Sequence, residues 1–241
     1  KKEKNKISAR KALIELFVYS KKLKKEFYKK HGINLKIVFN KDYSTYDSKC
    51  KIIDPKTPII KIGIYELINP QYSTSEKFID TTVALMHEYR HADGITSNYY
   101  NIREKDDENL YLLINHLATN KNPTYYEYIE NYKYSPCEID AEKFAIENAK
   151  DFMTSVFTEK EIDDSIINYV NHQSENDKSY KIPPKPGGYH SMQEIINAFD
   201  EAFENSKCHE RKLDLSSWDE YALLMSNYNW IDMRNKLYLI A

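Results

Sequence analysis

The sequence predicts an α+β fold, with a small sheet and one central helix first and a mainly helical half after them. Two β-branched stretches, residues 33–40 (INLKIVFN) and 56–67 (KTPIIKIGIYEL), lie between helical patterns. The other patterned stretches of the 241 residues are helical and are separated by loops. Hydrophobic residues make up 41% and charged residues 30% of the chain, which is typical of a globular protein and not of a disordered one.

The first expected helix covers residues 7–30 and ends at Gly32, since glycine commonly follows the last turn of a helix. Residues 33–40 alternate and are β-branched, which predicts the first strand. A polar loop is expected through residues 41–51, before the second strand at 56–67. The apolar residues of the helix recur at helical spacing: Leu13, Ile14, Phe17, Val18, Leu23 and Phe27.

The next helix opens at residues 73–76, where Ser-Thr-Ser-Glu forms a capping box. It is expected to end at Gly94. The loop PPKPGG at 183–188 indicates a boundary within residues 173–189, where polar residues give way to prolines and glycines. Further helices are expected at 105–118, 136–157, 159–171, 190–206 and 216–238.

Charge and composition exclude several classes of partner. A net charge of −2 gives no overall attraction to nucleic acid, and no apolar run of 18 residues predicts a membrane span. Three cysteines do not make a disulfide framework, which favours a reducing, cytoplasmic environment. Since the first residue is Lys and not Met, secretion after removal of a signal remains an alternative.

Residues 87–91 read His-Glu-Tyr-Arg-His and predict a metal site with a catalytic base. On a helix, His87 and His91 share one face about one turn apart, so both imidazoles can bind one ion. Zinc takes histidine nitrogens in a tetrahedral site that keeps one position for water. Glu88 lies beside that position, where it can act as general base. The competing interpretation is a solvated helix face with two ordinary histidines.

A catalytic zinc site needs a third protein ligand, and a later helix offers one. Glu138 and Glu142 share a face of this helix, and Ala141 and Ala145 are small enough for close contact between helices. We expect Glu138 to bind the metal and Glu142 to accept the free ring N–H of a ligating histidine. Two alternatives for Asp140 stay open at this stage: it is the third ligand, or it takes the role of Glu142. An acidic, solvated face is the other interpretation.

These residues resemble the gluzincin branch of the zincin metallopeptidases. The resemblance rests on His87-Glu88-Tyr89-Arg90-His91 followed by Glu138-Ile139-Asp140-Ala141-Glu142. The helix at 138–145 also resembles, more loosely, that of the ImmA/IrrE-type peptidases of bacteria and their mobile elements. Two features depart from these patterns: Glu142 stands where gluzincins usually have Asp, and Glu138 is farther from His91 than in compact ImmA-like members.

The resemblance covers roughly residues 30–150 and implies a zincin-like domain, assigned to residues 1–172, with a small sheet packed on the motif helix. The helical pattern, and not the resemblance, indicates a helical region over 173–241. The resemblance also implies a bacterial or mobile-element zinc metallopeptidase that hydrolyses a protein or peptide substrate. The strand near residues 59–65 would be the edge strand that lines the cleft. Tyr189 and His190 would supply a second donor to the transition state, because a glycine-rich loop precedes them.

Other interpretations of the same sequence remain open. The chain is alternatively a catalytically inactive zincin-fold module that binds a protein partner through residues 151–241. Hydrolysis of a non-peptide amide is a third possibility, and Mn, Fe or Co suit the same ligands as zinc. Tyr134 is a weaker candidate donor, and Asp93 either orients His91 or is exposed near the helix end. The sequence does not indicate the oligomeric state or the cleavage preference.

Overall fold

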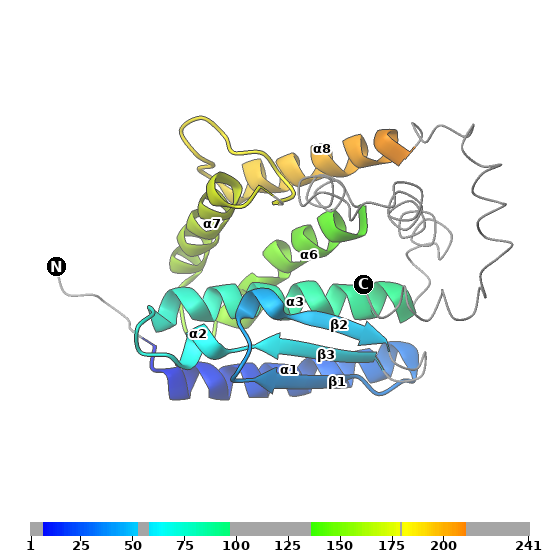
Figure 1. Ribbon diagram of the computed structural model, residues 1–241, viewed down its shortest axis with the longest axis vertical. Helices are drawn as coiled ribbons and strands as arrows, with labels where there is room; N and C mark the ends of the chain where they lie inside the picture. The colour runs from blue at the N-terminus through cyan, green and yellow to red at the C-terminus, as the bar shows by residue number, and fades with distance from the viewer. Residues whose placement is uncertain (1–6, 53–57, 97–135, 179, 211–241) are drawn as a thin grey trace, which may run out of the picture.

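The computed structural model describes residues 7–52, 58–96, 136–178 and 180–210, and this part of the chain is α+β (Figure 1). The predicted helices at 105–118 and 216–238 and Tyr134 lie outside the described residues. The elements follow the order α1 (Ala9–His31), β1 (Lys36–Asn40), the 3-10 turn η1 (Thr45–Asp47), β2 (Lys49–Ile52), β3 (Pro58–Gly63), α2 (Tyr65–Ile68), α3 (Thr74–Thr96), α6 (Pro136–Met153), α7 (Glu159–Asn176) and α8 (Met192–Glu210).

Helix α1 confirms the first expected helix and its stop signal. At its start, the Ser8 hydroxyl accepts a hydrogen bond from the main-chain N–H of Lys11. At its end, Gly32 adopts the left-handed conformation with a φ of 68° and donates its N–H to the carbonyl of Tyr28. Glycine adopts this conformation without the Cβ clash of other residues, so the stop signal has a clear physical reason.

The sheet has the strand order β1-β3-β2, with β3 parallel to β1 and antiparallel to β2. The expected polar loop at 41–51 therefore contains η1 and most of β2, so that prediction is wrong in part. Strand β2 alternates lysine with Cys50 and Ile52, and Cys50 is buried in the core. Because β2 occupies the outer position, β3 is the central strand and the prediction of an edge strand at 59–65 is also wrong.

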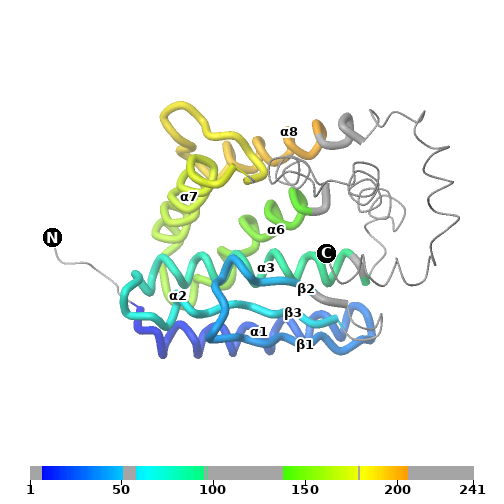
Figure 2. The backbone as a smooth tube through the Cα atoms, in the orientation of Figure 1, coloured from blue at the N-terminus to red at the C-terminus, as the bar shows by residue number. Residues whose placement is uncertain are grey.

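Helices α1 and α3 lie on the same side of the sheet (Figures 1 and 2). The side chains that fill the space between these layers are aliphatic and aromatic and are fully buried or nearly so. They include Leu16, Leu23, Phe27, Ile37, Ile60, Ile62, Val83 and Leu85. Burial of one such side chain stabilises the fold by roughly 1.5–3 kcal/mol, so this layer fixes α3 against the sheet.

Gly63 holds the end of β3 close to the loop that leads into β2. A Cβ added to Gly63 would lie 1.7 Å from the carbonyl oxygen of Ser44, which only glycine avoids. Next to this contact, the carboxylate of Glu66 accepts hydrogen bonds from the Ser44 hydroxyl (2.6 Å) and the Thr45 N–H (3.0 Å). These contacts anchor the chain immediately before β2 and so help to place the edge strand.

Helix α3 begins in the predicted capping box but continues past Gly94 to Thr96, so the predicted end is wrong. The last turns are held by tertiary contacts at Asp93, which is buried. Its carboxylate binds the ammonium of Lys30 (2.7 and 2.8 Å) and Nε2 of His31 (2.8 Å), both at the end of α1. Such contacts outweigh the cost of a glycine inside a helix, which is about 0.5–1 kcal/mol relative to alanine.

Helix α6 packs across α3 more extensively than any other described pair of elements. Ala141, Ala145 and Ala149 are fully buried, and these small side chains permit the close approach that the sequence predicted. Helix α6 ends at Met153, short of the predicted residue 157. Helix α7 extends to Asn176, beyond the predicted residue 171, and the proposed boundary within 173–189 falls on its end and on the loop before α8.

None of the helices in the described ranges combines the length and the apolarity that a bilayer-spanning helix needs. This agrees with the expectation from the sequence.

Candidate metal centre

Helices α3 and α6 bring His87, His91 and Glu138 together, as the sequence predicted for the ligand set. Nε2 of His87 lies 3.0 Å from Nε2 of His91 and 3.2 Å from one carboxylate oxygen of Glu138. Nε2 of His91 lies 3.2 Å from the other oxygen. Two imidazole nitrogens and one carboxylate group therefore meet at one place, from two helices that are distant in sequence.

The distances between these atoms suit a small tetrahedral ion. Ligands placed 2.0–2.1 Å from zinc at tetrahedral angles are about 3.3 Å apart. The two imidazole nitrogens are 3.0 Å apart, and each lies 3.2 Å from a different oxygen of the Glu138 carboxylate, which is close to this edge length. Two imidazoles and one carboxylate also form a donor set that zinc accepts in catalytic sites. The residues present thus fit a zinc ion in both chemistry and spacing.

The contacts of His87 favour positive charge at this point. Nδ1 lies 2.9 Å from the Glu142 carboxylate and Nε2 lies 3.2 Å from the Glu138 carboxylate, and ionised carboxylates only accept hydrogen bonds. A neutral imidazole carries one proton for these two contacts, so one ring nitrogen faces a carboxylate with its lone pair. Two acceptors at this distance repel one another unless a proton or a metal ion lies between them. The Glu142 carboxylate thus lies within hydrogen-bond distance of a ring nitrogen of His87.

Without a metal ion, a proton on His87 satisfies the contact between its Nε2 and the Glu138 carboxylate. Burial opposes the charge on the ring, but hydrogen bonds to Glu138 and Glu142 outweigh burial and raise the pKa of His87 to about 10. Burial also opposes ionisation of Glu138, but the charges and hydrogen bonds of His91 and His87 hold its pKa well below the ordinary value. Both shifts mark a site with strong attraction for positive charge.

Glu88 lies in a different environment from Glu138, although both are buried carboxyls. Burial raises the pKa of Glu88 above its ordinary value, against the opposing charges of His87 and His91. The main-chain N–H of Cys50, on edge strand β2, donates a hydrogen bond to the Glu88 carboxylate. A raised pKa brings a carboxyl closer to the range in which it exchanges protons at neutral pH. Glu88 is thus a buried carboxyl with a raised pKa that lies beside His87 and contacts β2.

Two tyrosines near Glu142 were missed in the sequence. The Tyr169 hydroxyl donates to the carboxylate of Glu142 over 3.4 Å. Burial, followed by the Glu142 charge, raises the pKa of both Tyr169 and Tyr180 well above the ordinary value. Since the chain contains 21 tyrosines, no sequence signal distinguishes these two from the others. They place Glu142 in a buried polar cluster behind His87.

Replacement of Glu142 tests its role. Glu142→Gln keeps the shape of the side chain but removes the charge that favours the Nδ1–H tautomer of His87. We expect zinc affinity, measured by competition with a chromogenic chelator, to fall about 10–100-fold. Glu147→Gln, on an exposed position of the same helix, should leave the affinity unchanged. Equal affinities for the two variants would show that Glu142 does not support the metal.

Asp140 lies against Arg90 and outside the ligand cluster, contrary to both alternatives considered for it. The Arg90 guanidinium donates from Nε (2.7 Å) and Nη2 (3.2 Å) to the two carboxylate oxygens. Such a bidentate pair has fixed geometry. It joins α3 to α6 beside the metal ligands and so contributes to holding the two helices in register.

The Asp140–Arg90 pair gives a stability prediction that separates it from the ligands. Asp140→Asn removes the bidentate partner of the partly buried Arg90 guanidinium and leaves it the longer contact with Asp93 (3.4 Å), so we expect the free energy of unfolding to fall by roughly 1–2 kcal/mol. Zinc stoichiometry should stay at one per chain. Urea unfolding and elemental mass spectrometry measure the two quantities. A variant of unchanged stability that loses its metal would restore Asp140 as a ligand.

Asp93 is neither exposed nor attached to His91. It is buried and bonded to Lys30 and His31, as described above. Nδ1 of His91 is buried and has no hydrogen-bond partner within the described ranges. Asp93 therefore attaches helix α1 to α3. The ring of His91 is instead contacted by His87 and Glu138.

Tyr189 and His190 do not support the predicted role as donors to the transition state. Tyr189 is buried, and its hydroxyl donates to the carbonyl of Pro183 (2.8 Å). Asn171 holds the main chain of Tyr189 through its N–H (2.7 Å) and carbonyl (3.0 Å). The glycine-rich loop is thus attached to α7 through the contacts of Tyr189 with Asn171.

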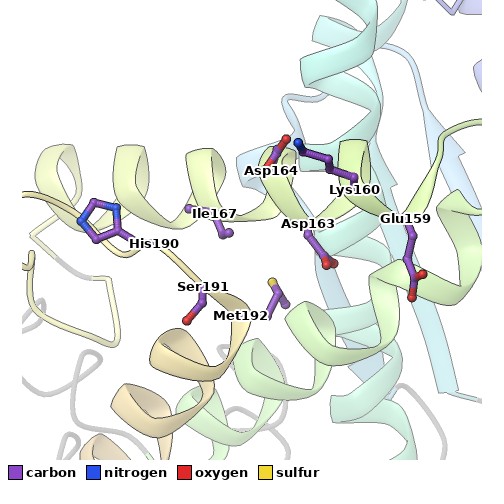
Figure 3. A pocket seen from close by; sticks show the side chains of 8 residues that line it. All are labelled: Glu159, Lys160, Asp163, Asp164, Ile167, His190, Ser191 and Met192. Carbon is purple, nitrogen blue, oxygen red and sulfur yellow. The ribbon is translucent and has the colours of Figure 1, made fainter.

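His190 is exposed and lines an open pocket of about 410 Å³ between α7 and the start of α8 (Figure 3). In this view His190, Ser191 and Met192 lie across from the α7 residues Asp163, Asp164 and Ile167. The ligand histidines are not among the residues that line this pocket. No contact in the described part of the chain joins His190 to the metal cluster.

No protein-family model matches the chain, and no curated protein or solved structure is similar to it at a significant level. The assignment of a function therefore depends on the geometry and chemistry of the site.

Proposed function

We propose that this protein is a zinc-dependent metallopeptidase with a zincin-like fold, in which His87, His91 and Glu138 bind the ion. The observation that carries this proposal is the convergence of two imidazole nitrogens, 3.0 Å apart, on the Glu138 carboxylate, whose oxygens lie 3.2 Å from them, with Glu88 buried next to His87. Solvated helix faces do not produce such a cluster of buried acceptors, since each unpaired acceptor is destabilising.

Each residue of the site has a separate role in peptide hydrolysis. Zinc, when bound, lowers the pKa of water and polarises the carbonyl of the substrate. Glu88 accepts a proton from the attacking water and then passes it to the amine that leaves. Glu142 keeps the proton of His87 on Nδ1, so that Nε2 remains a ligand. Burial of Glu88 favours both proton transfers, because its raised pKa lies nearer to neutrality.

Strand β2 offers a place for the substrate. Among the described strands, none pairs with its outer edge, and Cys50 of this edge donates its N–H to Glu88. An extended peptide can pair with the edge through main-chain hydrogen bonds, which brings its peptide groups close to the base. In this proposal β2, and not the strand at 59–65, is the edge strand that binds the substrate.

The first test is the metal content of freshly purified protein, measured by elemental mass spectrometry. We expect about one zinc per chain in the wild type and none in His87→Ala, because one of three protein ligands is then missing. His172→Ala, an exposed histidine on α7, is the matched control and should retain the metal.

Two other outcomes decide against the proposal. No metal in any variant, even after zinc is offered, would exclude a metalloenzyme. Zinc bound at one per chain without cleavage of a random peptide pool would favour the alternative, an inactive zincin-fold module that binds a protein. Cleavage that stops with a chelator and returns with zinc supports the peptidase.

A further inference from the structure

Three lysines lie on the face of the sheet that is turned away from α1 and α3. Lys49 of β2 is directly opposite Lys61 of β3, and Lys61 is opposite Val38 of β1. Lys36 is two residues before Val38 and therefore on the same face. Their neighbours in the strands, Ile37, Cys50 and Ile60, are buried toward the helices. We call the face formed by Lys36, Lys49 and Lys61 the lysine face.

The lysine face concentrates positive charge on one side of the sheet. Like charges directly opposite one another on adjacent strands are destabilising, and Lys49 and Lys61 form such a pair. No acidic side chain in the described ranges forms an ion pair or a hydrogen bond with any of the three lysines. The charge balance of the whole chain is slightly negative, at −2, so this face is a local feature and not a reflection of composition.

The position of Lys49 connects this face with the proposed substrate edge. Lys49 immediately precedes Cys50, whose main-chain N–H contacts Glu88. A peptide paired with the outer edge of β2 would direct every second side chain toward the lysine face. Those side chains would lie across from Lys49, about 4.5–5.5 Å away between Cβ atoms, with Lys61 one strand farther in. Carboxylates at these positions would neutralise the repulsion between the two lysines.

We infer that the substrate segment is an acidic one, an extended strand with Asp or Glu at alternate positions that face Lys49 and Lys61. This inference rests on the proposed function, since the segment is bound at the edge next to Glu88. Nucleic acid suits the face less well. Val38 and Ile59, which lie between the lysines, are aliphatic and provide no aromatic platform for the stacking of bases.

The test uses the full chain and three synthetic pools of ten-residue peptides. The pools carry Asp/Glu, Asn/Gln or Lys/Arg at alternate positions and are random elsewhere. Cleavage by the zinc-loaded wild type is followed by mass spectrometry. Binding of fluorescent pools to the zinc-loaded Glu88→Gln variant is followed by anisotropy. We expect the acidic pool to be cleaved and bound about tenfold better than the amide pool, less so at high salt.

Charge reversal provides the decisive comparison. Lys49→Glu combined with Lys61→Glu should reverse the order of the pools, so that the basic pool is preferred. The same two substitutions in the Glu88→Gln background serve the binding measurement. Lys21→Glu with Lys25→Glu, on exposed positions of α1, changes the net charge equally and should leave the order unchanged.

The outcomes separate this inference from the proposed function. We call the Lys49→Glu, Lys61→Glu protein the sheet variant. Equal cleavage of the three pools, or a preference for the acidic pool that the sheet variant retains, would overturn the acidic substrate and leave the peptidase in place. No cleavage of any pool, with binding that reverses in the sheet variant, would reject the peptidase and keep the acidic partner. If no pool is cleaved and no pool is bound selectively, both the acidic substrate and the peptidase are overturned. Tighter binding of a single-stranded oligonucleotide that the sheet variant loses would also overturn the acidic substrate, in favour of nucleic acid.

Discussion

Glu88→Gln is expected to lower kcat for peptide hydrolysis by about a thousandfold, within the range that general bases contribute. The amide has the shape of the carboxylate but does not take a proton at neutral pH. Glu88 is not among the three ligands, so zinc should remain at one per chain. The main-chain N–H of Cys50 can still donate to the amide oxygen, so the local fold should be retained.

The measurement combines steady-state kinetics on a cleaved peptide with the metal content of the same sample. Glu76→Gln, on an exposed position in the first turn of the same helix, is the matched control and should retain full activity. A Glu88→Gln variant with wild-type kcat would remove Glu88 as the base. Loss of zinc together with activity would instead place Glu88 among the groups that hold the ion.

Glu138→Gln is expected to have the second largest effect, on metal binding and on the stability that depends on it. It replaces the only ligand contributed by α6 with a neutral amide and leaves two histidines. We expect zinc affinity to fall by more than about 100-fold, the upper limit for loss of a residue that only supports a ligand. Zinc present at a thousand times its Kd stabilises the wild type by about 4 kcal/mol, and most of this should disappear.

Thermal unfolding with and without zinc measures the effect, since the shift in Tm reports the binding free energy. Glu147→Gln on the outer face of α6 should show the full wild-type shift. An undiminished shift in Glu138→Gln would mean that the third ligand comes from elsewhere. Glu138→Gln also removes the carboxylate that faces His87 and His91 in the metal-free protein. The zinc-dependent Tm shift of each protein is therefore measured against the metal-free form of that same protein.

The parts of the site that depend on local geometry could be predicted from the sequence. His87 and His91 share a helix face because a helical turn has 3.6 residues, and their spacing does not depend on the rest of the chain. The small residues Ala141 and Ala145 indicated that the Glu138 helix packs closely on a neighbour, which the structure confirms. That this neighbour is α3 was an expectation from the resemblance.

The parts that depend on tertiary contacts could not be predicted. Gly94 follows the rule for a helix end, but contacts of Asp93 with α1 carry α3 beyond it. Strand β2 was missed because its lysines are typical of a loop, and only pairing with β3 shows that Cys50 faces the core. Tyr189 was assigned to the site because glycines precede it, whereas Asn171, on a separate helix, holds its main chain.

The division of the ligands between α3 and α6 has a consequence for the motions of the protein. Any partial opening that separates these two helices pulls Glu138 away from His87 and His91 and breaks the site. Under the proposed function, zinc binding adds its free energy to the free energy of that opening, whereas fraying at the start of α1 is unaffected. Amide exchange across the interface between α3 and α6 would then measure metal occupancy.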